Sequence, residues 1–328
     1  MRPNQPPTGR ITLVVLAIVA GAMAFPWHSA RERWVLGIAI VIAITLLARW
    51  RGLPVTTILG RRLAMRRQSR GARSAVQSAT DVRTTALLRV TPPESGLDAL
   101  PLPLIAGYAD RYGLRADAVR VTSRDFASDT GARQRETWIG LTLSAADNLA
   151  ALQARSPQIP LHETAEVAAR RLADHLRESG WTAAIAEPDD IPELYVRSAH
   201  ETWGGIEQGS GDYVAAYQVK ADNALPNTLA AIWSYPVRET WTAVEITGAG
   251  DQQTLAVACA IRTDAPPAAG GPLPGLISQS GSHRPALTAL HPLSTQRLDG
   301  HVALPEALLL TRLHWPSTIA QQPSAALS

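Results

Sequence analysis

Two long apolar segments and a run of arginines, all between Ile11 and Arg73, limit what this chain can fold into. The first segment, Ile11–Trp27, has 17 residues and no charge, so as a helix it would rise roughly 26 Å, near the lower limit for crossing a bilayer. The second, Ala30–Arg51, has 22 residues and would rise about 33 Å. Both are apolar on all sides. We therefore predict a transmembrane helical hairpin within residues 1–52.

The residues at the ends of these segments fit that prediction. Pro26 ends the first helix, Ser29 and Glu32 can form a capping box for the second, and Gly52 ends it. Tryptophans prefer the membrane interface, and we expect three there: Trp27, Trp34 and Trp50. A cleaved signal peptide and a buried hairpin in a soluble core are the alternative interpretations.

The arginines predict the orientation of the hairpin. The turn between the helices carries only two, whereas eight lie at or after the end of the second helix, and we expect these at the membrane surface: Arg49, Arg51, Arg61, Arg62, Arg66, Arg67, Arg70 and Arg73. Positive charge stays on the cytoplasmic side, so both termini should be cytoplasmic in a multi-pass inner-membrane protein. Residues 53–80 are predicted as a basic juxtamembrane amphipathic helix and linker on the bilayer surface. A solvated basic linker is the alternative.

Charge is divided unevenly along the chain. Residues 1–80 hold 12 arginines and one glutamate, whereas the remainder holds 19 basic and 27 acidic residues. A basic N-terminal region, residues 1–80, which we call the basic foot, therefore precedes an acidic globular part. This balance, and the lack of aromatics among the arginines, argue against nucleic-acid binding and favour protein partners. The single cysteine, Cys259, lies in an apolar run and is predicted to be a core thiol.

The acidic part reads as a mixed α/β cytoplasmic domain over residues 81–264. Alternating or apolar runs predict strands at Thr84–Val90, Ala118–Thr122, Thr137–Leu143, Trp181–Ala186, Tyr213–Lys220, Val237–Thr247 and Thr254–Arg262. Helical patterns occupy Leu102–Tyr112, Asn148–Arg155, His162–Ser179 and Leu229–Trp233, and the glycine-rich stretch Gly204–Gly211 is predicted as a loop. In the longest helix, Val167, Leu172 and Leu176 should face the core. Residues 265–328 are predicted as a loop-rich C-terminal part with a last helix at Ala303–Leu313 and a disordered tail.

A weak internal repeat is present. The triplet Glu136-Thr137-Trp138 recurs at Glu201–Trp203 and Glu239–Trp241, and Ala146-Asp147-Asn148 recurs at Ala221–Asn223. Two related α/β halves explain this pattern. The alternative is that these triplets recur by chance, because the chain is rich in Ala and Thr.

No motif predicts a reaction. The chain has no phosphate-binding GxxxxGK[ST] loop and no GxSxG nucleophile elbow. His162, Glu163 and Glu166 resemble the start of a zincin motif, but the second histidine is missing. Asp189-Asp190 reads as a solvated turn, and four histidines near the C-terminus lack ligand spacing: His283, His291, His301 and His314. We therefore predict no catalytic residue, no metal site and no cofactor.

Four stretches resemble the EccE component of the ESX (type VII) secretion systems: Pro7–Arg10, Phe25–Trp27, Arg33–Gly37 and Arg51–Arg67. The length is similar to that of the shorter, iron-acquisition-linked paralogue. The resemblance implies a structural subunit of an inner-membrane complex with EccB, the EccC ATPase and EccD, which exports WXG and PE/PPE type proteins. A membrane-tethered enzyme acting on a lipid-linked or nucleotide-sugar substrate is the leading alternative, and a membrane sensor is another.

Overall fold

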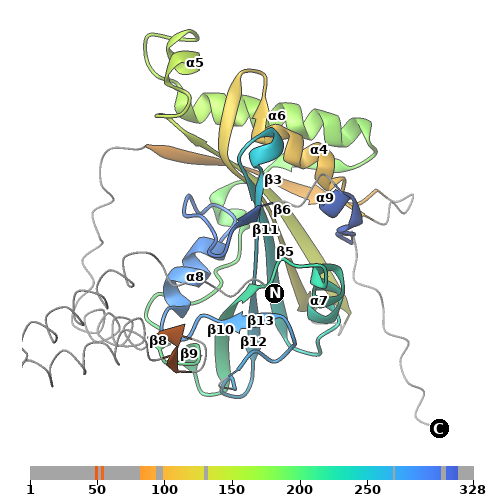
Figure 1. Cartoon of the computed structure of the whole chain (residues 1–328), viewed down its shortest axis with the longest axis vertical. Coiled ribbons are helices and arrows are strands. Elements are labelled where there is room, and N and C mark those ends of the chain that lie inside the picture. The colour runs from red at the N-terminus through yellow and green to blue at the C-terminus, as the bar shows by residue number, and fades with distance from the viewer. Residues whose placement is uncertain are drawn as a thin grey trace, which may run out of the picture. The chain divides into compact units, whose positions relative to one another are not determined.

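A computed structural model describes residues 49–50, 53–54, 82–93, 99–128, 132–268, 270–303 and 308–316 (Figure 1). The chain divides into two compact units, Met1–Ala75 and Val76–Ser328. In the first, β1 (Arg49–Trp50) and β2 (Leu53–Pro54) pair antiparallel. The predicted second helix was therefore wrong at its end, because Arg49 and Trp50 already lie in a strand. Among the described residues, no helix combines the length and apolar character needed to cross a membrane.

The predicted hairpin and basic foot lie outside the described residues, apart from the backbone of β1 and β2. The same holds for the side chains of every residue that we predicted to face the membrane: Trp27, Trp34, Trp50, Arg49, Arg51, Arg61, Arg62, Arg66, Arg67, Arg70 and Arg73.

The first half of the second unit has the strand order of a ferredoxin-like fold. Along the chain it contains β3 (Arg83–Thr91), α4 (Leu102–Ala106), β5 (Leu114–Ala127), β6 (Arg133–Ser144), α6 (Leu161–Glu178) and β7 (Thr182–Ile185). In the sheet the strands lie in the order β7-β3-β6-β5, and all neighbours are antiparallel. A βαββαβ chain with this order is the ferredoxin-like arrangement. Short elements are inserted: η1 (Gly107–Ala109), β4 (Asp110–Arg111) and α5 (Leu149–Gln153).

The second half repeats this strand order without the second helix. It contains β10 (Asp212–Val219), α7 (Leu225–Trp233), β11 (Glu239–Thr247), β12 (Thr254–Thr263) and β13 (Leu276–Ser278). These strands lie in the order β13-β10-β12-β11, again antiparallel. The halves join because β5 pairs antiparallel with β11, so the second strand of each half meets the other in one continuous sheet.

The repeated triplets do not mark these two halves. Glu136–Trp138 lies on the third strand of the first half, whereas Glu239–Trp241 lies on the second strand of the second half. The third copy begins in β8 (His200–Glu201), which with β9 (Ile206–Gly209) extends the sheet beyond β10. The halves are thus alike in topology, while the triplets occupy positions that are not equivalent.

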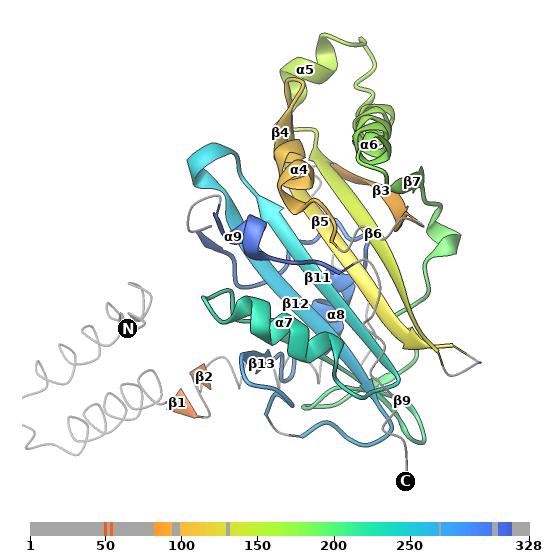
Figure 2. The ribbon, with the colours of Figure 1, turned by 90° about the vertical axis from the view of Figure 1, so that its right-hand side faces the viewer.

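Both faces of the sheet are covered. One face packs against α4, α6, α7 and α9 (Leu308–Arg312), and the opposite face against α8 (His283–Leu290); Figure 2 shows α7 and α9 on one side of the strands and α8 on the other. All nine positions of β11 are buried in consequence. Small side chains let α6 lie close to β3, and its buried residues include Ala165, Ala169 and Leu172.

Several local predictions were wrong. Val167 is 45% exposed, whereas Leu172 and Leu176 are buried as predicted. The helix predicted over Leu102–Tyr112 ends at Ala106, because the chain turns at Tyr112 and Gly113 to pair β4 with β5. The loop predicted over Gly204–Gly211 contains β9.

The C-terminal part contributes to the same sheet. We predicted residues 265–328 as loop-rich, and their described residues form β13, α8, β14 (Val302–Ala303) and α9. β13 pairs with β10, and β14 pairs with β12. After α9, the Trp315 indole donates to Ser123 Oγ at 2.8 Å, which fixes the end of the described chain against β5. Two short 3-10 helices complete the fold, η2 (Pro188–Asp190) and η3 (Gly250–Gln252).

Candidate functional site

Six charged side chains of alternating sign cross the α8 face of the sheet. We call this set the ion-pair row; in strand order it consists of Arg89 (β3), Glu136 (β6), Arg124 (β5), Glu239 (β11), Arg262 (β12) and Asp212 (β10). Each glutamate bridges two arginines. Because a buried charge is costly unless it is paired, the alternation lets six strands carry charge inside the fold.

The ion-pair row is most buried near its centre. Glu136 accepts from Arg89 at 2.9 Å and from Arg124 at 3.2 Å. Glu239 pairs with Arg124, and its other oxygen lies 2.8 Å from Arg262 Nε. The Glu239 side chain is 8% exposed, whereas that of Arg89 at the end of the row is 49% exposed. The row therefore links both halves through its most buried member.

An aromatic stack lies beside the ion-pair row. The rings of Trp138 and Trp241 have centroids 5.6 Å apart and planes 9° apart. The Trp241 indole donates to Glu239 at 3.0 Å, and the Arg124 guanidinium lies 4.2 Å from the centroid of the Phe126 ring. Stacked rings and a cation over a ring face are favourable arrangements. Charge and aromatic contacts thus act together where β5 and β11 join the halves.

A second buried centre fixes the segment after α8. The Glu245 carboxylate accepts from Arg120 Nε at 2.8 Å, from the Leu298 backbone N–H at 3.0 Å, and faces His301 Nε2 at 3.0 Å. Arg120 also donates to the carbonyls of His291 (3.1 Å), Ser294 (3.3 Å) and Gln296 (2.5 Å). One buried arginine thereby holds three backbone carbonyls of the segment after α8 onto the sheet.

This centre shifts two pKa values. Burial raises the pKa of Glu245, but the contacts with His301, Arg120 and the Leu298 N–H together outweigh burial and lower it overall. Burial and the nearby positive charge of Arg120 lower the pKa of His291, against an opposing effect of Glu193. The His291 Nδ1 also accepts the Leu293 N–H at 3.3 Å, which requires the neutral ring.

The N-terminal end of α8 is anchored in a similar way. His283 is fully buried: its Nδ1 accepts the Ala216 N–H at 3.1 Å, and its Nε2 lies 3.2 Å from the Trp203 carbonyl. Arg284 donates to the carbonyls of Arg197 at 3.0 Å and Ala199 at 2.5 Å. These histidine and arginine contacts hold the segment around β8 against α8.

The other residues singled out from the sequence do not come together. His162 is exposed and pairs with Glu166 at 3.3 Å, and Asp190 accepts the Glu187 N–H at 3.3 Å in η2. Cys259 is fully buried, and burial raises the pKa of its thiol, as expected of a core thiol. Within the described residues, no group of three His, Cys, Asp or Glu side chains is placed to hold a metal ion.

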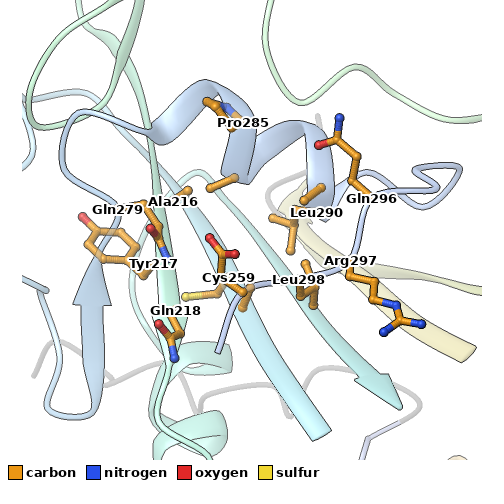
Figure 3. A pocket seen from close by; sticks show the side chains of 14 residues that line it. Ala216, Tyr217, Gln218, Cys259, Gln279, Pro285, Leu290, Gln296, Arg297 and Leu298 are labelled. Atoms are coloured by element: carbon orange, nitrogen blue, oxygen red, sulfur yellow. The ribbon is translucent and has the colours of Figure 1, made fainter. Parts of the chain in front are cut away.

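A small cavity of about 110 Å³ lies between α8, β10, β12 and the segment 296–299 (Figure 3). Its polar lining includes Gln218, Gln279 and Gln296, and the Leu290 and Leu298 side chains point toward it. Pockets for drug-sized ligands are about 300–1,000 Å³ and mostly apolar. By size and lining this cavity suits ordered water.

Sequence reasoning missed the ion-pair row and the Arg120–Glu245 centre. The available signal was a charge in the middle of a predicted strand, such as Arg120 within Ala118–Thr122 and Glu245 within Val237–Thr247. A buried charge of this kind predicts a buried partner. It does not predict which one, because Arg120 and Glu245 lie 125 positions apart.

Comparison with known proteins identifies the family. A family model described as "Putative type VII ESX secretion system translocon, EccE" matches residues 131–219, from β6 to β10. The four stretches that carry the sequence resemblance lie between Pro7 and Arg67, so the family model matches a different part of the chain.

Curated relatives match over nearly the whole length. ESX-3 secretion system protein EccE3 of Mycobacterium tuberculosis (strain CDC 1551 / Oshkosh) is 54% identical over 329 residues, which cover 99% of this chain and 97% of the relative. ESX-3 secretion system protein EccE3 of Mycolicibacterium smegmatis (strain ATCC 700084 / mc(2)155) is 51% identical over 296 residues, covering 89% and 90%. This chain belongs to the EccE family, and it is a component of a type VII ESX secretion system.

Proposed function

We propose that this chain is a non-enzymatic structural subunit of the inner-membrane core complex of an ESX-3 type secretion system. The observation that carries the proposal is identity above 50% to proteins named EccE3 over nearly the full chain. Two ion pairs inside the second unit support the proposal: Arg124–Glu239 joins the strands of the two halves, and Arg120–Glu245 helps to hold the segment after α8. Removing one partner of such a buried pair would leave an uncompensated charge and destabilise the fold.

The proposal includes a membrane anchor and partners. In this proposal two spans lie within residues 1–48, ahead of β1, and the eight arginines from Arg49 to Arg73 lie on anionic headgroups, with both termini in the cytoplasm. The family resemblance supplies the partners: EccB and EccD type subunits and an EccC type ATPase that provides the energy. The exported proteins are of the WXG and PE/PPE types, and the export serves iron acquisition.

Co-purification tests the proposal. An affinity tag follows Ser328 in the host, membranes are solubilised in mild detergent, and accompanying proteins are identified by mass spectrometry. EccB, EccC and EccD type subunits should co-purify with the tagged chain. A tagged chain that migrates alone, while the other subunits still assemble with one another, would refute the proposal.

Two variants of α6 show whether the second unit takes part in assembly. Leu172 is fully buried and Arg170 is exposed, so Leu172→Glu should unfold the unit whereas Arg170→Glu should not. Co-purification should be lost with the first variant and kept with the second. Equal recovery of partners with both variants would limit assembly to residues outside this unit.

A further inference from the structure

The turn between β4 and β5 has an unusual residue at its tip. Asp110 pairs with Arg115 and Arg111 with Leu114, which leaves Tyr112 and Gly113 as a two-residue turn. Their φ angles are 57° and 69°, and Tyr112 is the one residue other than glycine with a positive φ in the described part of the chain. Such turns favour asparagine and glycine, because a side chain with a large Cβ substituent is strained there. The tyrosine is therefore retained at a cost in stability.

The Tyr112 side chain is exposed and accompanied by cations. Its side chain is 46% exposed. The guanidinium carbon of Arg171 lies 4.7 Å from the ring centroid and that of Arg111 lies 5.3 Å from it. Tyr108 holds the base of the turn, since its ring lies edge-on to Tyr112 and its hydroxyl is 2.6 Å from His175 Nδ1. The exposed ring is thus presented by a fixed support.

The two guanidinium groups keep their donors available. Among the described residues neither Arg111 nor Arg171 takes part in an ion pair with a carboxylate, in contrast to Arg170 and Arg177 on the same helix. A guanidinium that lies against an aromatic ring still presents N–H groups at its edge to an acceptor. The pair is therefore ready to bind an anionic partner.

Exposed apolar side chains surround this turn. Val167 lies one helical turn before Arg171 and is 45% exposed. Leu149 is 43% exposed and follows Asn148, whose side chain bonds both the N–H and the carbonyl of Arg115 at 2.8 Å. Figures 1 and 2 show α5 and α6 at the same end of the unit, with β4 beside α5 in Figure 2. We call the set Arg111, Tyr112, Arg115, Leu149, Val167 and Arg171 the hairpin–helix surface.

We propose that the hairpin–helix surface binds an acidic segment with apolar side chains from another subunit of the secretion complex. This inference rests on the proposed function and adds the surface and the chemistry of the partner. Tyrosine and arginine are among the residues that most often carry binding energy at protein interfaces, and the contacts around them exclude water. Unpaired arginines select carboxylates as the complement.

A lipid surface fits less well. Membrane-binding patches carry clusters of four to eight basic residues. Here carboxylates are interspersed, because Asp110 adjoins the turn and Glu163 and Asp174 are exposed on α6. A flat layer of anionic headgroups would meet these carboxylates together with the arginines, whereas a single acidic peptide segment can contact the arginines alone. Aromatic residues and arginine are both enriched at protein interfaces.

Site-specific crosslinking in the full-length, tagged protein tests the inference. A photoreactive phenylalanine derivative replaces Tyr112 in host membranes, and the same derivative at Val196, which is 53% exposed, is the control position. Position 112 should crosslink to one subunit of the complex, in a peptide rich in Asp, Glu and apolar residues. Position 196 should give at least about tenfold less of that product.

Charge reversal shows whether the arginines hold the partner. Arg111→Glu with Arg171→Glu should lower the yield of this crosslink about tenfold or more, whereas Arg170→Glu should leave it unchanged. Tyr112→Asn relieves the strained φ, so the unit should stay folded and Cys259 should remain protected from thiol reagents. Co-purification of the partner should nevertheless fall. That separation is not expected if Tyr112 serves only the fold.

The outcomes separate this inference from the proposed function. If the tagged chain co-purifies with its partners but position 112 crosslinks only to lipid or to nothing, the inference is wrong and the proposed function stands. If the chain has no partners at all, the proposed function fails first. An equal effect of the Arg170→Glu control would likewise overturn the role of the two arginines.

Discussion

Trp138 on β6 and Trp241 on β11 stack face to face across β5, with ring centroids 5.6 Å apart and planes within 9° of parallel. Because β6 belongs to the first half and β11 to the second, this contact joins the two halves on the face that α8 covers. Three features thus connect the two halves into one continuous sheet: the β5–β11 strand pair, the ion-pair row and this stack.

The stack predicts energetic coupling between the two rings. Trp138→Leu and Trp241→Leu should each lower the free energy of unfolding by about 2–4 kcal/mol, and together by about 1 kcal/mol less than the sum, because the second change has no stacking left to remove. Cys259, the single cysteine and fully buried, reports unfolding through its reaction with a thiol reagent in urea.

A second pair supplies the control for this cycle. Trp181 is also buried but belongs to the other core cluster. Trp138→Leu and Trp181→Leu should therefore add within about 0.5 kcal/mol. Coupling of the same size in both pairs would show that the stack has no special part in joining the halves.

Glu239 should be the most costly member of the ion-pair row to neutralise. Glu239→Gln keeps the shape of the side chain but leaves Arg124 and Arg262 without their shared carboxylate, so the unit should lose about 3 kcal/mol of stability. Asp264→Asn removes a carboxylate from an exposed pair with Arg238 and should change stability by about 0.5 kcal/mol or less. Urea unfolding followed through Cys259 compares them, and similar losses would contradict a central role for the row.

His291 should make the unit sensitive to mild acid. Burial and Arg120 lower its pKa in the folded state, so its contribution to stability is present above the usual histidine pKa of about 6.5 and is lost as pH falls below that value. His291→Asn keeps an acceptor for the Leu293 N–H but cannot be protonated in this range. The variant should therefore lose less stability than the wild type between pH 7 and 5.

An exposed histidine provides the comparison for this pH dependence. His314→Asn should retain the wild-type slope of stability against pH, because His314 is exposed. Unfolding is followed with a dipyridyl disulfide reagent, which reacts with Cys259 in mild acid as well. A wild-type slope in His291→Asn would assign the acid sensitivity to other groups.

The strands were predictable because local patterns determine them. Apolar alternation located five strands to within a few residues: β3, β6, β10, β11 and β12. The helical pattern likewise located α6 and its end before Gly180. The β4–β5 turn was missed, because tyrosine at a positive φ contradicts the usual turn residues. Val167 was placed in the core on hydrophobicity alone, although helix packing leaves it exposed.

The buried polar centres could not be predicted in the same way. The partners Arg124 and Glu239 are 115 positions apart, and they meet only because β5 pairs with β11 in one register. A shift of that register by one residue would move Glu239 to the opposite face of the sheet. The whole fold determines which distant strands pair. Ion pairs between such strands therefore cannot be read from any local sequence pattern.

The proposed topology predicts which positions are accessible from outside the cell. Single cysteines replace Ser29 and Ser74 in a Cys259→Ser background, and spheroplasts are treated with an impermeant maleimide. Position 29 lies in the predicted external turn and should be labelled, whereas position 74 follows the arginines and should react only after lysis. Labelling of position 74 but not 29 in intact spheroplasts would reverse the topology.

The most direct test of whether this protein serves as an assembly subunit, and not as an enzyme, is complementation of a strain that lacks it. The strain is complemented with the wild type or with a triple variant, His162→Ala, Asp189→Ala and Asp190→Ala. These three exposed residues are the ones that we weighed, from the sequence, as parts of a metal or catalytic site. Secreted substrates are quantified alongside co-purification of the complex. We expect wild-type export and wild-type assembly for the triple variant. Loss of export while the complex remains assembled would contradict this expectation and favour a membrane-tethered enzyme.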